Sequence, residues 1–210
     1  MDHYNEDYFT WQKSMGKIGA KLNKFLFQYY ITSNDNVLDF GCGGGFLLNE
    51  LDASKKLGVE INKSGRENAQ TLSITTVGTI AEVEDEWASV IISNHALEHV
   101  DRPLDIIKDL IPKIKKGGKI IFVTPFERTN SYKANDINYH LYTWSPMNLG
   151  NLFHRAGLEV IEVKKISHKW PPKFDKLVKL FGYNLTGSLS KVYGILNRSQ
   201  TQVRIVARKK

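Results

Sequence analysis

A cluster of glycines between a buried-strand pattern and a helical pattern constrains the fold of this chain more than any other feature. Residues 37–40 (VLDF) are typical of a short buried strand, 41–45 (GCGGG) of a tight loop, and 46–51 (FLLNEL) of a helix. Glycines in such a loop allow backbone N–H groups to approach a ligand closely, and the helix directs its positive end toward the same place. The unit therefore predicts a ligand-binding loop at the end of a strand.

Strand and helix patterns continue to alternate after the loop. The expected strands cover 56–61, 74–77, 89–93, 119–124, 158–166 and 202–207, and the expected helices cover 62–72, 104–114 and 148–156, the second of these closed by Gly117 and Gly118. Strands that alternate with helices of this length are joined by parallel crossovers, and each strand must be covered on both faces. The sequence therefore predicts an α/β fold that is a three-layer αβα sandwich.

Two helical segments lie outside this pattern. Apolar residues recur at helical spacing between Tyr8 and Tyr30, so we expect one or two amphipathic helices within residues 1–35. An insertion at 167–200 mixes lysines with apolar residues, which predicts a basic amphipathic helix followed by a second helical piece at 189–196. A length of 210 residues suits one moderately large domain, 1–210.

The positive charge is concentrated toward the end of the chain. The formal net charge is +7, yet residues 164–210 contain twelve Lys and Arg residues and a single acid, Asp175. Nucleic acid, anionic lipid headgroups and phosphorylated substrates would each suit this segment, and so would simple exposure to water.

Cysteine usage and hydropathy indicate the compartment. The lone cysteine, Cys42, excludes an intramolecular disulfide and favours reducing conditions. No run approaches the roughly 18 apolar residues of a membrane-spanning helix. Residues 1–7 (MDHYNED) are acidic where a signal peptide is basic. We therefore expect a cytoplasmic protein.

The order of glycines in the loop distinguishes between ligands. Dinucleotide-binding loops follow G-x-G-x-x-G, whereas this loop reads G-x-G-x-G and has Phe46 where the last glycine would be needed. Asp39, directly before the loop, adds a carboxylate that suits a cationic amine and would repel a pyrophosphate. Glu60, at the end of the next strand, is placed to accept hydrogen bonds from both hydroxyls of a ribose. A ligand with a ribose, an amine and a carboxylate, and without phosphate, fits these residues best.

Several segments, in order along the chain, resemble class I S-adenosylmethionine (SAM)-dependent methyltransferases of the type 11/12 group. Residues 37–45 (VLDFGCGGG) resemble the first motif of that family, 58–61 (GVEI) its ribose-binding acid, 91–100 (IISNHALEHV) the segment after its fourth strand, and 117–121 (GGKII) the start of its fifth. The resemblance implies a Rossmann-like, mostly parallel seven-stranded sheet with an antiparallel last strand. It also implies SAM as cofactor, S-adenosylhomocysteine as product, and an N-terminal lid helix.

The resemblance also assigns candidate cofactor-binding residues, which are Trp11, Asp39, Gly41, Cys42, Gly43, Phe46, Glu60, Ile61, Ile80, Ala81, Asn94, His95 and Ala96. One expected feature is missing. Family members often carry an acid after the third strand that meets the adenine amine, whereas 77–81 (VGTIA) has none. Adenine recognition is then expected to rest on backbone groups and on the apolar faces of Ile80 and Ala81.

Histidines are the candidate catalytic residues. Methyl transfer requires alignment, exclusion of water and removal of a proton from the nucleophile. His95, Glu98 and His99 fall at i, i+3 and i+4, so we expect them on one side of a helical turn beside the methyl group. An imidazole with a pKa near neutrality suits deprotonation of a hydroxyl, so His95 and His140 are the candidate general bases.

The same H-x-x-E-H string allows a metal interpretation. Some small-RNA 2′-O-methyltransferases and ubiquinone-pathway O-methyltransferases resemble this segment and hold a divalent ion with E-x-x-E-H and a later histidine, the place of His140 here. His95 replaces the first glutamate, and such a constellation needs geometry before it is functional. We therefore expect no metal, with His99 as a hydrogen-bonded structural residue. The surrounding motifs exclude a zinc protease.

The acceptor is indicated only by resemblance. The N-terminal helices, residues 139–146 (YHLYTWSP) and the basic insertion resemble small methyltransferases of bacterial surface-polysaccharide biosynthesis. This implies O-methylation of a small molecule, sugar or glycan, phosphorylated or lipid-linked, with the insertion meeting phosphate or a membrane surface. An RNA 2′-O-methyltransferase and a non-catalytic SAM-binding module remain as alternatives.

Overall fold

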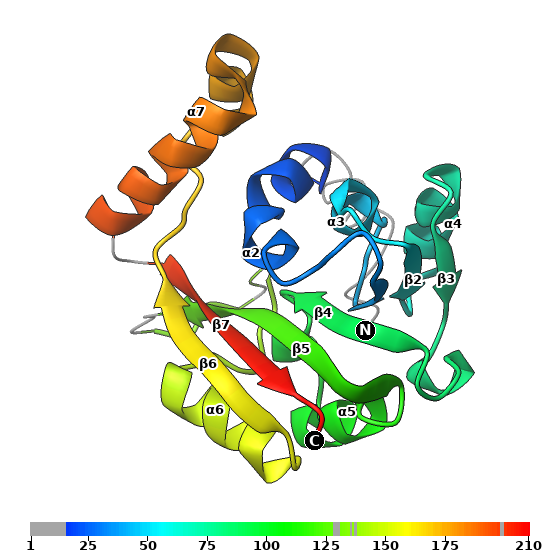
Figure 1. Ribbon diagram of the computed structural model, residues 1–210. Helices are drawn as coiled ribbons and strands as arrows, with labels where there is room; N and C mark the ends of the chain where they lie inside the picture. The colour runs from blue at the N-terminus through cyan, green and yellow to red at the C-terminus, as the bar shows by residue number, and fades with distance from the viewer. Residues whose placement is uncertain (1–15, 128–130, 135, 137, 198–199) are drawn as a thin grey trace.

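The computed structural model describes residues 16–127, 131–134, 136, 138–197 and 200–210, in which a 7-stranded sheet has the order β3-β2-β1-β4-β5-β7-β6 (Figure 1). The strands are β1 (Asn36–Phe40), β2 (Lys55–Val59), β3 (Thr75–Val77), β4 (Ala88–Asn94), β5 (Ile114–Glu127), β6 (Glu159–Ile166) and β7 (Gln200–Arg208). Strands β1 to β5 pair in parallel, whereas β7 runs antiparallel between β5 and β6. The expected mostly parallel sheet with an antiparallel last strand is confirmed.

Helices cover both faces of the sheet. They are 16–23, α2 (Phe25–Gln28), α3 (Phe46–Glu50), α4 (Lys63–Thr71), α5 (Pro103–Leu110) and α6 (Pro146–Arg155), with 3-10 turns η1 (Ile80–Glu82) and η2 (Leu97–His99). Successive residues of β5 point to opposite faces: Phe122 belongs with Phe153 of α6 to one buried cluster, and Val123 belongs with Phe27 of α2 to the other. The core therefore lies in two layers, one on each side of the sheet, as the three-layer fold requires.

The position of β1 in the sheet determines where a ligand can bind. β1 lies between β2 and β4, so the chain leaves it toward one neighbour and later returns on its other side. Ligands of open α/β sheets bind outside the carboxyl ends of the strands at such a switch point. The glycine loop that follows Phe40 lies at this point.

The boundary expected between the helix over 104–114 and the next strand is wrong. The helix ends earlier, at Leu110, and the strand begins earlier, at Ile114. Pro112 explains the early end, because proline has no N–H with which to continue the helical hydrogen bonds. The glycine pair that was expected to close the helix instead lies inside β5, where Gly117 has φ +75°.

The insertion before the last strand forms α7 (Phe174–Leu196), which projects from the sheet (Figure 1). A break at Gly182, with φ 74° and ψ 175°, divides it into two helical pieces. Two pieces were expected, but the division before Leu189 is wrong, because the left-handed backbone at the break suits Gly182. Among the described residues, no helix combines the length and the apolar character needed to cross a membrane.

Candidate active site

The loop after β1 is built from glycines in a backbone that other residues rarely adopt. Gly41, Gly43 and Gly45 have φ of 73°, 53° and 76°. A Cβ on Gly41 would lie 2.4 Å from the Cβ of Ala96, so only glycine allows the loop to approach the segment after β4. The N–H of Gly41 donates to the carbonyl oxygen of Val59 at 2.9 Å, which fixes the loop against the end of β2.

Glu60 joins this loop to the end of β2. Its Oε2 accepts from the Gly43 N–H and its Oε1 accepts from the Asn62 N–H, both at 2.8 Å. Burial raises the pKa of Glu60, and these backbone hydrogen bonds oppose part of that effect. Each carboxylate oxygen keeps a lone pair for another donor. Glu60 can therefore accept from ribose hydroxyls while it holds the loop in place.

Asp39 is a buried carboxyl group with an unused oxygen. Its side chain is buried, and its Oδ1 has no hydrogen-bond partner among the residues that the structure describes. Burial, followed by the nearby charge of Glu60, raises the pKa of Asp39 well above its ordinary value. A buried carboxylate is unfavourable unless a cation or a donor meets it. The ammonium group of an amino acid would supply both.

Two cavities lie on either side of the loop. The first cavity, of about 530 Å³, lies between the loop, helix 16–23, the end of β5, the start of β7 and residues 168–170. The second cavity, of about 470 Å³, lies between Glu60, η1, η2 and α5. Four residues line both cavities, which are Gly41, Gly43, His95 and His99. The cavities therefore adjoin each other between the glycine loop and the segment after β4.

The described candidate residues all lie on the walls of these cavities. The first cavity is lined by Asp39, Cys42, Phe46, Asn94 and His140, the second by Glu60, Ile61, Ile80, Ala81 and Ala96, and both by Gly41, Gly43 and His95. Trp11, and with it the start of the expected lid, lies outside the described residues. The candidates thus trace one continuous site on both sides of the loop.

Some wall residues gave no signal in the sequence. Asp109 of α5 brings a carboxylate to the second cavity, where no acid was expected. Glu82, by contrast, accepts from the Thr79 N–H at 2.8 Å and so caps η1. The first cavity includes Asn23 and residues 168–170. These residues belong to no local motif, and only tertiary folding brings them to the site.

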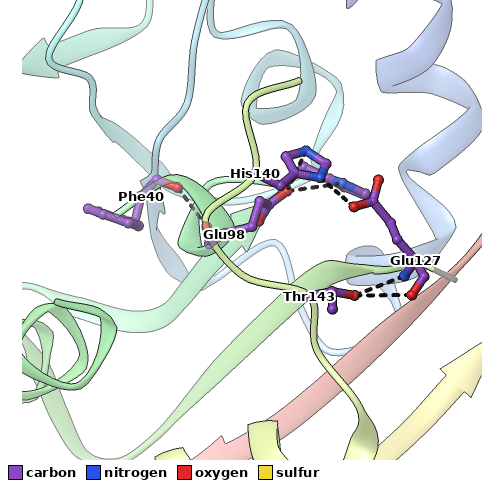
Figure 2. A network of polar contacts seen from close by, with 7 residues as sticks. Phe40, Glu98, Glu127, His140 and Thr143 are labelled. Carbon is purple, nitrogen blue, oxygen red and sulfur yellow. Dashed lines mark hydrogen bonds and ion pairs between the residues drawn. The ribbon is translucent and has the colours of Figure 1, made fainter. Parts of the chain in front are cut away.

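A buried glutamate with three histidines lies at the edge of the first cavity. Glu98 is fully buried, and its Oε1 lies 3.3 Å from Nδ1 of His95 and 3.9 Å from Nε2 of His140. The other ring nitrogen of His140, Nδ1, lies 3.0 Å from Oε2 of Glu127 at the end of β5 (Figure 2). The His99 ring packs against His140 with centroids 4.9 Å apart. Burial lowers the pKa of His99.

Backbone contacts hold this cluster in place. The Leu141 N–H donates to the carbonyl oxygen of Glu98 at 2.9 Å, and the Glu127 N–H donates to Oγ1 of Thr143 at 3.0 Å (Figure 2). The expected shared helical turn is wrong for His95, because η2 begins at Leu97 and His95 precedes it with φ 57°. The two side chains at i and i+3 still meet.

The same group of side chains fits a divalent cation. Ligand atoms of Glu98, His99 and His140 lie within 4.8 Å of one another. Both carboxylate oxygens of Glu98 are buried and accept no hydrogen bond from the described residues, although Oε1 lies 3.3 Å from Nδ1 of His95. Carboxylate and imidazole are common ligands of divalent transition metals. These residues could therefore hold an ion, although none was expected from the sequence.

The sequence matches the protein family described as "Methyltransferase domain" over residues 8–163. It is 27% identical over 150 residues to the ubiquinone biosynthesis O-methyltransferase of Hydrogenovibrio crunogenus, which covers 63% of this chain and 62% of that protein. It is 32% identical over 116 residues to the mitochondrial ubiquinone biosynthesis O-methyltransferase of Dictyostelium discoideum, covering 45% of this chain and 36% of that protein. The chain thus spans less than two thirds of the length of these relatives.

Solved structures share the fold at low sequence identity. A SAM-dependent methyltransferase of Thermotoga maritima, described as a possible histamine N-methyltransferase, aligns with a TM-score of 0.70 and 18% identity over 99% of this chain and 97% of that chain. Phosphoethanolamine N-methyltransferase 2 of Haemonchus contortus, in complex with SAM, aligns with a TM-score of 0.64 and 14% identity over 91% of this chain and 52% of that chain. The family match covers most of the chain and the fold agrees with it, so the protein belongs to the class I SAM-dependent methyltransferases.

Proposed function

We propose that this enzyme methylates a hydroxyl group of a small molecule. The observation that carries the proposal is the meeting of the two cavities at His95 and His99, with His140 on the wall of the first. The second cavity then holds the adenosine part of SAM beside Glu60, and the first holds the amino-acid part beside Asp39 and the acceptor beyond it. The curated relatives carry the name O-methyltransferase, which supports oxygen as the methylated atom.

His140 is the proposed general base. We place the ring proton on Nδ1, which lies 3.0 Å from Oε2 of Glu127, so that Nε2, 3.9 Å from Oε1 of Glu98, takes the proton of the acceptor hydroxyl. Bound SAM supplies a methyl group that is already activated on a sulfonium. The chain itself therefore aligns the acceptor, excludes water and removes the proton. His95 lines both cavities and is the second candidate base, with Nδ1 directed to Glu98.

A screen of acceptors with methyl-labelled SAM tests this function. The panel contains sugars, nucleotide sugars, lipid-linked glycans, catechols and short RNA. We expect label in a small hydroxyl-bearing compound, and a sugar or glycan is our proposed class. Transfer only to RNA, with binding that falls steeply with salt, would replace the proposal with a 2′-O-methyltransferase. SAM binding without transfer to any acceptor would indicate a non-catalytic module.

Asp39 makes SAM binding depend on pH. Its pKa is raised in the free protein, and an ammonium group beside it favours the ionised form. Binding therefore releases a proton, and affinity rises with pH below the raised pKa, by at most about tenfold per pH unit. Calorimetric titrations at several pH values above the ordinary pKa of an aspartate, about 3.9, in two buffers of different ionisation enthalpy, measure this release. A heat that is the same in both buffers would contradict it.

The cluster of Glu98, His99 and His140 favours a second mechanism, in which a divalent ion assists deprotonation of the acceptor. The buried carboxylate of Glu98 beside His99 and His140 suits a divalent ion, which when bound would lower the pKa of an acceptor hydroxyl. Assays in excess chelator, with and without added Mg²⁺ or Zn²⁺, separate the two mechanisms. Full activity in chelator supports the histidine base alone, and activity that returns only with the ion supports the metal.

The α7 helix supports peripheral contact with an anionic membrane as part of the proposed function. Its second piece exposes Leu185, Leu189, Val192 and Leu196 at i, i+4, i+7 and i+11, along one side of the helix. The opposite side packs inward through Thr186, Ser190 and Gly194. The first piece carries Lys176 and Lys179 with the single acid Asp175 and directly follows Lys173, and Lys191 of the second piece lies over the ring of Phe25. An apolar stripe on a helix that also carries cations suits a surface of anionic lipid headgroups.

Vesicle binding checks this contact. We expect co-sedimentation with vesicles that contain phosphatidylglycerol and little with pure phosphatidylcholine. Replacing both Leu185 and Val192 with glutamate should reduce binding at least tenfold, because it places charge in the stripe. The matched control is Ile161→Glu, an exposed apolar residue on β6 outside α7. Equal binding by the double variant and the control would contradict the contact.

A further inference from the structure

The wall of the first cavity that lies away from the glycine loop contains polar atoms without partners. Helix 16–23 contributes Asn23, the segment after β6 contributes His168, and the start of β7 contributes Thr201 and Gln202. Within the part of the chain that the structure describes, neither ring nitrogen of His168 has a hydrogen-bond partner, and neither do Asn23 Oδ1, Thr201 Oγ1 and Gln202 Oε1. Asn23, His168 and Thr201 are 8%, 2% and 5% exposed. We call these four residues the distal wall.

Buried polar atoms without hydrogen-bond partners lower the free energy of unfolding. Folded proteins pair the large majority of buried polar side-chain atoms, so each exception requires an explanation. Here the exceptions come from three separate elements and gather on one cavity, which is the pattern of a binding site that a ligand completes. Apolar side chains of the same shape would stabilise the protein more without a ligand.

The chemistry of the distal wall selects a class of ligand. Burial lowers the pKa of His168 to about 4, with the charge of Lys191 adding to the effect, so the ring is neutral near pH 7. Amide, hydroxyl and neutral imidazole groups each offer both a donor and an acceptor. Hydroxyl groups of a ligand match them in both directions, whereas an apolar ring would leave them unpaired.

Nearby residues narrow the class further. Trp170 lines the same cavity and lies against helix 16–23, where a Cβ on Gly19 would approach its ring to 2.5 Å. Its ring offers apolar surface beside the polar atoms. Lys169 also lines this cavity, and its Nζ lies 6.0 Å from the centroid of the Tyr193 ring. The four residues of the distal wall themselves carry no charge to pair with a phosphate. A neutral ligand with several hydroxyls on a compact ring therefore fits best.

We propose that Asn23, His168 and Thr201 form an acceptor subsite that hydrogen-bonds the hydroxyls of a sugar ring. The proposal rests on the proposed function and names its substrate class as a carbohydrate, in preference to an aromatic phenol or catechol. The subsite positions the acceptor and takes no part in proton transfer.

Ligand binding to the protein saturated with S-adenosylhomocysteine tests the subsite. The probes are the methyl glycosides of glucose, galactose, mannose and rhamnose, with catechol for comparison, and saturation-transfer NMR and calorimetry follow binding. We expect at least one glycoside to bind more tightly than catechol. Thr201→Val and His168→Phe should each weaken that glycoside about tenfold or more, because each removes a hydrogen-bonding group that the ligand uses. Affinity for S-adenosylhomocysteine should not change.

A matched variant controls for the loss of a buried hydroxyl. Thr186 of α7 is also fully buried with an unpartnered Oγ1, but it does not line the cavity. Thr186→Val should leave glycoside binding unchanged, and melting temperatures confirm that all variants fold. Thr201→Val replaces only a hydroxyl with a methyl group, so this variant still tests the subsite if His168→Phe does not fold. A protein that binds S-adenosylhomocysteine yet no glycoside, or Thr201→Val with parental glycoside affinity, overturns the subsite. Failure to bind S-adenosylhomocysteine would instead overturn the proposed function.

Discussion

Replacing Glu60 with alanine is expected to weaken SAM binding by about 100-fold or more, which corresponds to about 2.7 kcal/mol. The loss has two sources. The variant lacks the carboxylate that faces the ribose, and it leaves the N–H groups of Gly43 and Asn62 without the oxygens that they now reach at 2.8 Å. Hydrogen bonds to a charged group contribute about 1.5–3 kcal/mol each. Calorimetric titration with SAM and with S-adenosylhomocysteine measures the change.

Glu67→Ala is the matched control for this variant. Glu67 is an exposed glutamate on α4, and its partner is Lys63 at 3.7 Å. Exposed pairs of this kind contribute little, so SAM affinity should stay at the parental value. Parental affinity in Glu60→Ala would contradict the placement of the ribose in the second cavity and would require another ligand for the loop.

Local sequence was enough to predict that the residues around the glycine loop lie close together, for a physical reason. The strand, the glycines and Asp39 are contiguous, and Glu60 ends the neighbouring strand, so parallel pairing of β1 with β2 is enough to bring them together. The same spacing argument placed His95 beside Glu98, although the expected helical turn is absent at His95. Contact at i and i+3 requires only a tight change of direction, which the end of β4 provides.

The acceptor side of the site was beyond local sequence patterns. Thr201 reaches the first cavity because antiparallel pairing sets it opposite Phe126 of β5. His168 reaches it because α7 packs closely on this segment, where a Cβ on Gly194 would approach the backbone nitrogen of His168 to 2.8 Å. Glu127 likewise meets His140, which lies 13 residues further along the chain. Such contacts depend on register and on packing between distant segments, which no short motif records.

Replacing His140 with alanine is expected to lower kcat by about 100- to 10,000-fold while SAM affinity stays unchanged. The variant removes the nitrogen that takes the proton of the acceptor hydroxyl, but it touches neither the glycine loop nor Glu60. Glu127→Gln should lower kcat by a smaller factor, about tenfold, because the amide can still hold Nδ1 but no longer stabilises the protonated ring. Steady-state rates at saturating SAM and acceptor, with calorimetry of SAM binding, separate these effects.

The control for His140 is His154→Ala, which removes an exposed histidine at the end of α6 and should leave kcat unchanged.

A different result would identify His95 as the general base. His95 lines both cavities, so a parental kcat in His140→Ala together with a large loss in His95→Ala would transfer the role to His95. We expect the opposite order because the contact that orients His140 is the shorter one: Nδ1 of His140 lies 3.0 Å from Oε2 of Glu127, whereas Nδ1 of His95 lies 3.3 Å from Oε1 of Glu98. A large loss in His140→Ala with retained SAM affinity would therefore place proton removal at the first cavity, on the side that the acceptor enters.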